Sequence, residues 1–98
     1  MIYLFEAEVW VWDARKSETW TFVNLPDDAS AEVREIAGAI PRGFGSVRVT
    51  ATIGSTTWKT SIFPGSSGRY ALPVKKAVRK AEALDIGDTV TVRVELDA

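Results

Sequence analysis

The stretch Gly68–Leu96, GRYALPVKKAVRKAEALDIGDTVTVRVEL, decides the fold of this chain. Its order of residue types predicts a short strand, a helix that begins at Pro73, a turn and a second strand. Proline suits the first helical position, because its missing N–H has no helical partner there and its φ is already helical. Gly87 is expected to end the helix, since glycine adopts a positive φ without strain. The apolar stripe of this helix consists of Val74, Ala77, Val78, Ala81 and Leu84.

Two segments alternate strictly between apolar and polar residues, Ser46–Ile53 and the chain after Gly87. Alternation with a period of two is typical of a strand that buries one face. The residues expected in the core are Val47, Val49, Ala51, Ile53, Val90, Val92, Val94 and Leu96.

The amino-terminal part predicts a hairpin with strands at Ile2–Asp13 and Thr19–Leu25, joined by a loop at 15–17. Its register stays open, because a slip of one residue moves every side chain to the other face. The two alternatives group Trp20 and Phe22 either with Val9 and Val11 or with Trp10 and Trp12.

A helix follows the hairpin, with Asp28 or Ser30 as its cap and an end near Gly38. Gly54-Ser55-Thr56 then turns the chain into a strand at Thr57–Phe63. Together these elements predict a mainly β, small α+β fold of about six antiparallel strands, closed or nearly closed into a barrel capped by two short helices. An open sheet with both helices on one face is the alternative. Residues 1–98 are expected to form one domain.

Positive charge is concentrated in the middle of the sequence. Residues 1–40 carry a net charge of −5, residues 41–80 carry +8, and residues 81–98 carry −4. This segregation favours a positive face for an anionic partner. The opposing interpretation is that the acidic and basic segments pair with each other across the fold.

The strongest candidate site lies around the helix after Pro73. Its cations share one face, and two lysines stand in the first turn, where the helix dipole disfavours them. A glycine-rich loop at Gly65–Gly68 precedes them, and free backbone N–H groups next to basic side chains favour an anion. The predicted anion-binding residues are Arg69, Lys75, Lys76, Arg79 and Lys80. A solvated helix face without a ligand is the alternative.

Other chemistries find less support in the sequence. The chain has no cysteine and no histidine, which removes the thiol nucleophile, the commonest general base and the commonest metal ligands. Glu6 and Glu8 are expected to put both carboxylates on one side of a strand, where an exposed outer wall is the simplest interpretation. Ser61 has no histidine to activate it. The four tryptophans, Trp10, Trp12, Trp20 and Trp58, are expected in the core rather than in a stacking surface.

Several of these segments resemble a bacterial family, the domain of unknown function numbered nineteen-oh-five. The resemblance rests on Gly45-Ser46-Val47, on Trp58 with Thr60-Ser61, and on Leu72-Pro73 followed by Lys75-Lys76, Arg79 and Gly87-Asp88. It implies a barrel of the double-split type capped by helices, and no assigned activity. Leu72-Pro73, Arg79, Leu84 and Gly87-Asp88 are also similar to the swapped-hairpin domain of AbrB-type transcription factors, which bind DNA.

The sequence therefore predicts a non-enzymatic binding or interaction module for an anionic ligand, small or macromolecular, at the basic helix. A nucleic-acid-binding protein of the AbrB-like type that uses the same helix is the alternative, and an enzyme of unknown class is third. No cofactor, metal or membrane partner is expected. No apolar run approaches the ~20 residues of a membrane span, and the start of the chain lacks the pattern of a signal peptide, so a cytoplasmic location is expected.

Overall fold

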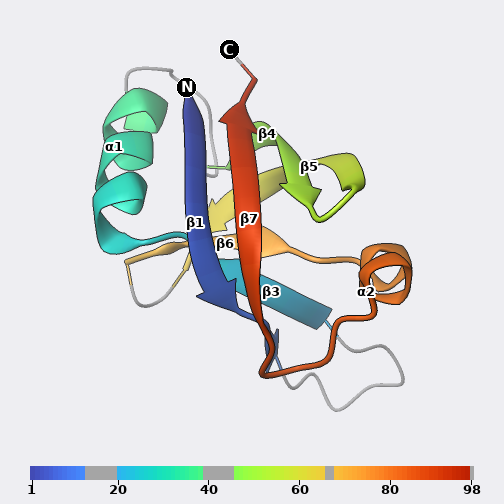
Figure 1. Ribbon diagram of the computed structural model, residues 1–98. Helices are drawn as coiled ribbons and strands as arrows, with labels where there is room; N and C mark the ends of the chain where they lie inside the picture. Colours follow the sequence, from blue (N-terminus) through green and yellow to red (C-terminus); the bar gives the residue numbers. More distant parts are fainter. Residues whose placement is uncertain (13–19, 39–45, 66–67, 98) are drawn as a thin grey trace.

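The computed structural model describes residues 1–12, 20–38, 46–65 and 68–97. Those residues form seven strands and two helices (Figure 1). In chain order the elements are β1 (Ile2–Glu8), β2 (Trp10–Trp12), β3 (Trp20–Asn24), α1 (Asp27–Gly38), β4 (Val47–Ile53), β5 (Thr56–Pro64), β6 (Tyr70–Pro73), α2 (Lys76–Glu82) and β7 (Thr89–Leu96).

The strands form one antiparallel sheet in the order β1-β7-β4-β5-β6-β3-β2. The two outer strands, β1 and β2, are consecutive in the chain and are separated only by Val9. Because one segment supplies both edges, the sheet must curl round until its edges approach each other. The prediction of a mainly β, nearly closed antiparallel barrel with two helices is therefore confirmed. The strand count is seven rather than six because the first predicted strand is interrupted at Val9, whose N–H donates to Asp88 O at 2.9 Å.

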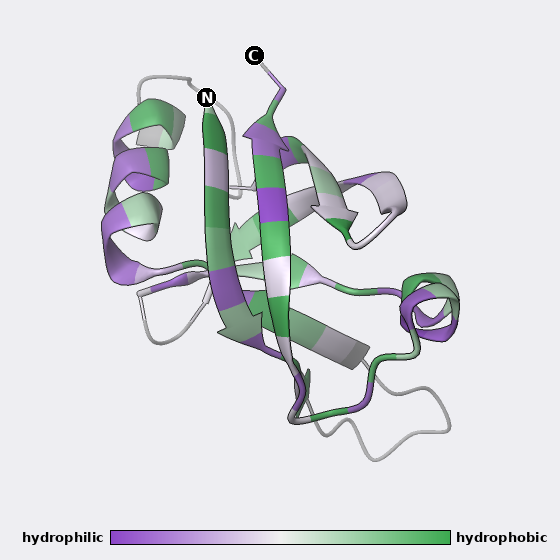
Figure 2. Ribbon diagram, viewed as in Figure 1, coloured by the Kyte–Doolittle hydropathy of each residue, from purple (hydrophilic) through white to green (hydrophobic). Residues whose placement is uncertain are grey.

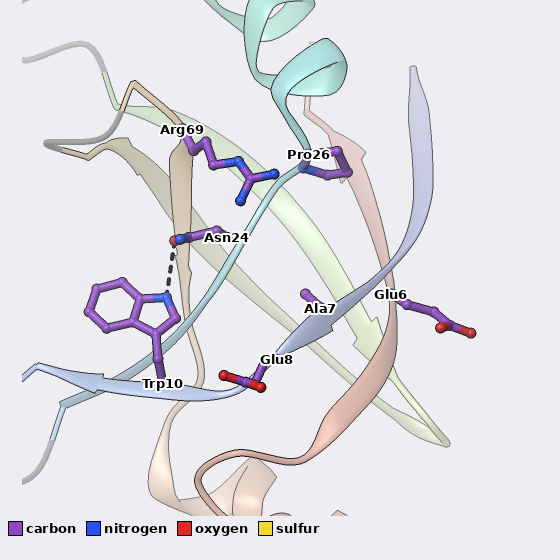
Figure 3. A pocket seen from close by; sticks show the side chains of 7 residues that line it. All are labelled: Glu6, Ala7, Glu8, Trp10, Asn24, Pro26 and Arg69. Carbon is purple, nitrogen blue, oxygen red and sulfur yellow. Dashed lines mark hydrogen bonds between the residues drawn. The ribbon is translucent and has the colours of Figure 1, made fainter.

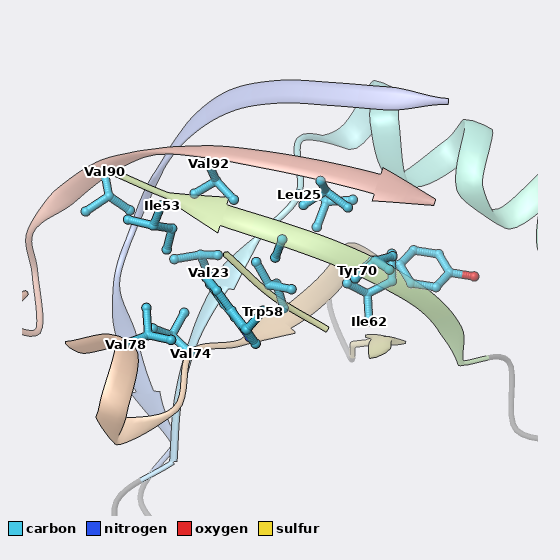
Figure 4. Packing of buried hydrophobic residues seen from close by; sticks show 14 of the residues in the cluster. Val23, Leu25, Ile53, Trp58, Ile62, Tyr70, Val74, Val78, Val90 and Val92 are labelled. Atoms are coloured by element: carbon cyan, nitrogen blue, oxygen red, sulfur yellow. The ribbon is translucent and has the colours of Figure 1, made fainter. Parts of the chain in front are cut away.

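The barrel interior is filled by the apolar halves of the alternating strands (Figure 4). Figure 2 shows the alternation of hydrophobic and hydrophilic residues along β7. Six of the eight residues predicted for the core are buried: Val49, Ala51, Ile53, Val90, Val92 and Val94. Val47 and Leu96, near the strand ends, are only partly buried and pack against the cluster. Trp58 is buried with them, as expected, whereas Trp10 is only partly buried and lies outside this cluster.

The register of the first hairpin is resolved by the pairing of β2 with β3. Trp10 lies opposite Phe22, and Trp12 lies opposite Trp20. Phe22 therefore shares a face with Trp10, and their rings stack with centroids 5.0 Å apart. The predicted hairpin loop at 15–17 lies outside the described residues.

Helix α1 begins at Asp27 and ends at Gly38, the end that the sequence predicts. Asp28 accepts a hydrogen bond from the N–H of Ala29 at 2.8 Å. Ser30 is not a cap, because it lies inside the helix and is buried. Its hydroxyl oxygen accepts from Tyr70 N–H at 3.0 Å and donates to Leu25 O at 3.4 Å, so it ties α1 to the start of β6.

The predicted start of the second helix at Pro73 is wrong. Pro73 is the last residue of β6 and pairs with Phe22 of β3. The chain stays extended through Val74, because its N–H donates to Thr21 O at 2.9 Å and its carbonyl accepts from Thr21 Oγ1 at 2.6 Å. Helix α2 begins three residues later than predicted, at Lys76, with Lys75 as its N-cap residue.

The predicted end of this helix at Gly87 is also wrong. Ala83 adopts the left-handed conformation, with φ of 53°, immediately after Glu82. Gly87 has the expected positive φ, 96°, but uses it in the later turn that leads into β7. The apolar stripe is narrower than predicted, since Ala77 and Ala81 are exposed and Val78 is the buried residue of α2. Within the described residues no helix is long and apolar enough to cross a membrane.

Candidate functional site

The five predicted anion-binding residues do not form one cluster. Arg69 precedes β6, whereas Lys75 and the residues after it follow the far end of that strand. Arg69 Nε forms an ion pair with Asp27 Oδ1 at 3.0 Å, at the start of α1. Figure 1 shows α1 and α2 on opposite sides of the barrel. The structure therefore assigns Arg69 to the α1 side and leaves four cations on the α2 side.

The glycine-rich loop likewise lies at the Arg69 end of β6, away from α2. The N–H groups of its two described glycines are engaged locally: Gly65 N–H donates to Arg69 O at 2.9 Å, and Gly68 N–H donates to Gly65 O at 3.2 Å. Arg34 of α1 donates to Gly68 O. The N–H groups of Gly65 and Gly68 therefore do not combine with the cations of the helix as predicted, and the remaining two residues of the loop lie outside the described residues.

The remaining four residues form what we call the basic face: Lys75, Lys76, Arg79 and Lys80. Lys76 and Lys80 stand one helical turn apart, a spacing that puts both side chains on the same side of α2. The three lysines are exposed, and Arg79 is partly buried. Arg79 Nε is a buried donor with no hydrogen-bond partner among the described residues. Such an atom is unfavourable in a folded protein and is uncommon in native structures.

No described acid neutralises the basic face through a direct ion pair. The two ion pairs found in the described part of the chain are Arg69–Asp27 and Arg93–Glu95. The acids of α1, which could have paired with the basic face, lie across the barrel. Glu82, on α2 itself, accepts hydrogen bonds from Thr56 Oγ1 at 2.5 Å and Ser55 Oγ at 3.3 Å. Its carboxylate is thus directed to the β4–β5 turn.

A second feature is an open pocket of about 530 Å³ between β1 and the end of β3. We call it the seam pocket; its lining residues are Glu6, Ala7, Glu8, Trp10, Asn24, Pro26 and Arg69 (Figure 3). Trp10 Nε1–H donates to Asn24 Oδ1 at 3.0 Å, which fixes both side chains. In Figure 3 the Arg69 guanidinium extends toward Asn24, while the Glu6 carboxylate points away from this group.

The sequence named Trp10, Glu6 and Glu8 as separate candidates but did not predict that they meet Arg69. No sequence pattern predicts that these residues are neighbours, because the pocket forms where β1 and β3 separate in the folded barrel. Among residues 1–12, 20–38, 46–65 and 68–97, no group of three or more acidic, histidine or cysteine residues could hold a metal ion.

The phenol of Tyr3, outside the residues that line the pocket, has a raised pKa. Tyr3 Oη donates to Glu32 Oε1 at 3.1 Å, which links β1 to α1. Desolvation, this hydrogen bond and the negative charge of Glu32 all raise the pKa of Tyr3, in that order of importance. Since the shift favours the neutral phenol, it fits a structural role better than a catalytic one.

Architecture and site together define a small helix-capped β-barrel with an exposed basic helix. The chain belongs to the family described as domain of unknown function DUF1905, which it matches over residues 5–94. No curated protein matches the chain.

Proposed function

We propose that this protein is a non-enzymatic binding module whose basic face, Lys75, Lys76, Arg79 and Lys80, holds an anionic partner. The observation that carries the proposal is that the three lysines are exposed and form no ion pair with any described acid. Exposed cations that the fold does not pair remain available to another molecule.

The shape of the basic face favours an extended anion. Its cations project from an exposed seven-residue helix, and Gly65 and Gly68 lie at the opposite end of β6 from them. A polyanion can contact several such side chains in succession and release its counterions, which supplies binding free energy without an enclosing pocket. Our second candidate, after an anionic partner of unspecified type, is a nucleic acid. The same exposed arrangement of cations suits a phosphate backbone. The proposal locates this binding in the bacterial cytoplasm.

Titration of labelled heparin and of a short labelled DNA duplex at several salt concentrations tests the proposal. Fluorescence anisotropy should show binding at low salt for the wild type. For the duplex, log K should fall with log salt by about 0.9 per phosphate contacted. Inorganic pyrophosphate, as a small-anion probe, should compete with a weaker salt dependence.

The decisive variant is Lys76→Glu combined with Lys80→Glu. Both side chains are exposed, so the free energy of unfolding should change by less than about 1 kcal/mol, while affinity for both polyanions should be lost. The matched control is Arg48→Glu combined with Lys59→Glu, which makes the same change of net charge on exposed residues of β4 and β5.

Equal loss in both double variants would show that net charge alone, and not the basic face, governs binding. Absence of binding by the wild type at low salt would refute the proposal outright. A large loss of stability in the α2 double variant would show that these lysines support the fold.

A further inference from the structure

The seam pocket lies where the barrel fails to close. The β2–β3 ladder extends from Trp12–Trp20 to Trp10–Phe22, and among the described pairings β1 continues beside β7 alone. Continued in the same register, this ladder would next pair Val9 with Val23 and then Glu8 with Asn24, and neither ladder pair is formed. Glu8 and Asn24 both line the pocket.

Hydrogen-bond alternation shows which backbone groups face this gap. Leu96 N–H donates to Met1 O at 3.0 Å, and Val9 N–H donates to Asp88 O at 2.9 Å. The odd-numbered residues of β1 therefore bond toward β7. In an antiparallel pair the intervening residues direct their N–H and C=O groups away from that partner. Glu6 and Glu8 thus present backbone donors and acceptors to the seam.

The opposite wall follows the same rule. Leu25 N–H donates to Tyr70 O and Val74 N–H donates to Thr21 O, both at 2.9 Å, so the odd-numbered residues of β3 bond toward β6. Asn24 then directs its N–H and C=O toward the seam. An extended chain placed at such an edge can complete the hydrogen bonds that the ladder leaves open.

Arg69 supplies a charged group at the same pocket. Its Nε is held by Asp27, and no described residue accepts a hydrogen bond from its two terminal nitrogens. Figure 3 shows this end of the side chain directed toward Asn24. The planar guanidinium fork matches a carboxylate, and an arginine fixed through Nε still offers its terminal N–H groups.

The charge around the pocket excludes a plain anion as the best ligand. The Glu8 carboxylate lies at the pocket and Asp27 holds Arg69, so two acids face the single cation. A ligand that carries both a carboxylate and a positive group complements this arrangement. The volume of about 530 Å³ falls within the range of about 300–1,000 Å³ for drug-sized ligands, which suits a peptide end rather than a long segment.

We propose that the seam pocket binds the carboxy-terminal end of an extended peptide that carries a basic side chain. The terminal carboxylate binds Arg69, the peptide backbone pairs with the free edge at Glu6 and Glu8, and the basic side chain lies by the Glu8 carboxylate. None of these residues belongs to the basic face, so the inference goes beyond the proposed function and does not depend on it.

The probes are the tripeptide Ala-Lys-Ala with a free carboxylate, the same tripeptide as its amide, Ala-Glu-Ala, and free lysine. Each is titrated into the ¹⁵N-labelled full chain, and backbone amide shifts are followed by NMR. Ala-Lys-Ala should shift the amides of Glu6, Glu8 and Asn24. The affinity of the amide form should be lower by a factor of about ten or more, because the amide lacks the charge-assisted hydrogen bonds to arginine. Ala-Glu-Ala and free lysine should also bind more weakly.

Arg69→Gln should reduce the affinity for Ala-Lys-Ala by a similar factor and abolish its preference over the amide. The matched control is Arg93→Gln, which removes an arginine of almost equal side-chain exposure (40% against 41%) that is also paired with one acid. This control should bind as the wild type does. Lys76→Glu with Lys80→Glu should leave peptide binding intact, which separates this inference from the proposed function.

Three results would overturn the inference. One is the absence of shifts at Glu6, Glu8 and Asn24 with millimolar Ala-Lys-Ala. Another is equal affinity for the acid and amide forms, which would remove Arg69 as the carboxylate partner. The third is equal affinity for free lysine and the tripeptide, because a ligand without a peptide backbone cannot complete the strand edge.

Discussion

Replacing Gly54 should destabilise the barrel by separating α2 from the β4–β5 turn. Gly54 has a φ of 60°, and a Cβ atom added there would lie 1.9 Å from Glu82 Oε1. An alanine would therefore adopt a strained left-handed conformation, which costs about 1–2 kcal/mol. It would also displace the Glu82 carboxylate from Thr56 and Ser55. Losing such part-exposed, charge-assisted hydrogen bonds costs about another 1–2 kcal/mol.

The expected total for Gly54→Ala is about 2–4 kcal/mol in the free energy of unfolding, measured by urea denaturation. Gly87→Ala is the matched control, because Gly87 has a φ of 96° and a Cβ there meets no atom within 4 Å. It should show the backbone strain alone, about 1–2 kcal/mol.

A double-mutant cycle isolates the contact. Glu82→Ala alone should cost about 1–2 kcal/mol, since it removes the same hydrogen bonds. In the Gly54→Ala background these bonds are already lost, so the second substitution should cost close to nothing and the cycle should show a coupling of about 1–2 kcal/mol. Additive effects, or a Gly54→Ala variant as stable as Gly87→Ala, would refute the reasoning.

Three further outcomes are expected. Val49→Asp should abolish cooperative folding, because Val49 is fully buried and its carboxylate would have no partner; a folded variant with an unchanged melting temperature would contradict this. Arg79→Met should keep or raise stability, by up to about 1 kcal/mol, since it removes the unpartnered Nε, yet weaken polyanion binding; a loss of more than 2 kcal/mol in urea denaturation would show that the guanidinium supports the fold. The raised pKa of Tyr3 favours its neutral form in the folded state, so its contribution to stability should be complete below pH about 10 and decline as the pH rises further. Glu32→Gln should lower the pKa of that phenol in a spectroscopic titration, and an unchanged value would exclude the contact with Glu32.

The strands were predictable from the sequence because local alternation determines them. The core faces of β4 and β7 are correct at all but their end residues. The break at Val9 could not be predicted, because Val9 continues the apolar alternation of β1 and is itself buried. The strand is interrupted because its pairing partner changes from β7 to β3. The local alternation of apolar and polar residues does not determine which strands pair.

The two helix errors also come from long-range contacts. Pro73 has an ideal residue type for a helix start, but two hydrogen bonds between Val74 and Thr21, which is 53 residues away, keep the chain extended. Gly87 has an ideal type for a helix end, but Leu84 N–H already donates to Arg79 O at 2.9 Å, and this bond closes the helix around Ala83. Residue preference is a weak prior that tertiary contacts override.

The sequence predicted the cations of α2 but not their separation from Arg69, because that separation depends on the strand between them. Arg69 and Lys75 are six positions apart, and an extended strand between them carries their side chains to different ends of the barrel. Seven of the eight positive charges of residues 41–80 are thus divided among the basic face, Arg69, and Arg48 and Lys59 on β4 and β5, and the eighth, Arg42, lies outside the described residues. The seam pocket could not be predicted, since its walls come from three separate segments.

The basic face combines three local features that each disfavour α2. Lys75 occupies the N-cap position without a side-chain hydrogen bond, where serine or aspartate would stabilise the helix by about 1 kcal/mol. Lys76 follows it in the first turn, against the helix dipole, and Arg79 holds a buried Nε without a partner in the described residues. All three belong to a seven-residue helix or its N-cap, and this helix buries only Val78 and is held to the β4–β5 turn through Glu82. Sequences depart from local rules mainly at functional positions, and an anion bound by these same side chains would offset each of the three. The anion proposal therefore accounts for unfavourable features that a purely solvated helix face leaves unexplained.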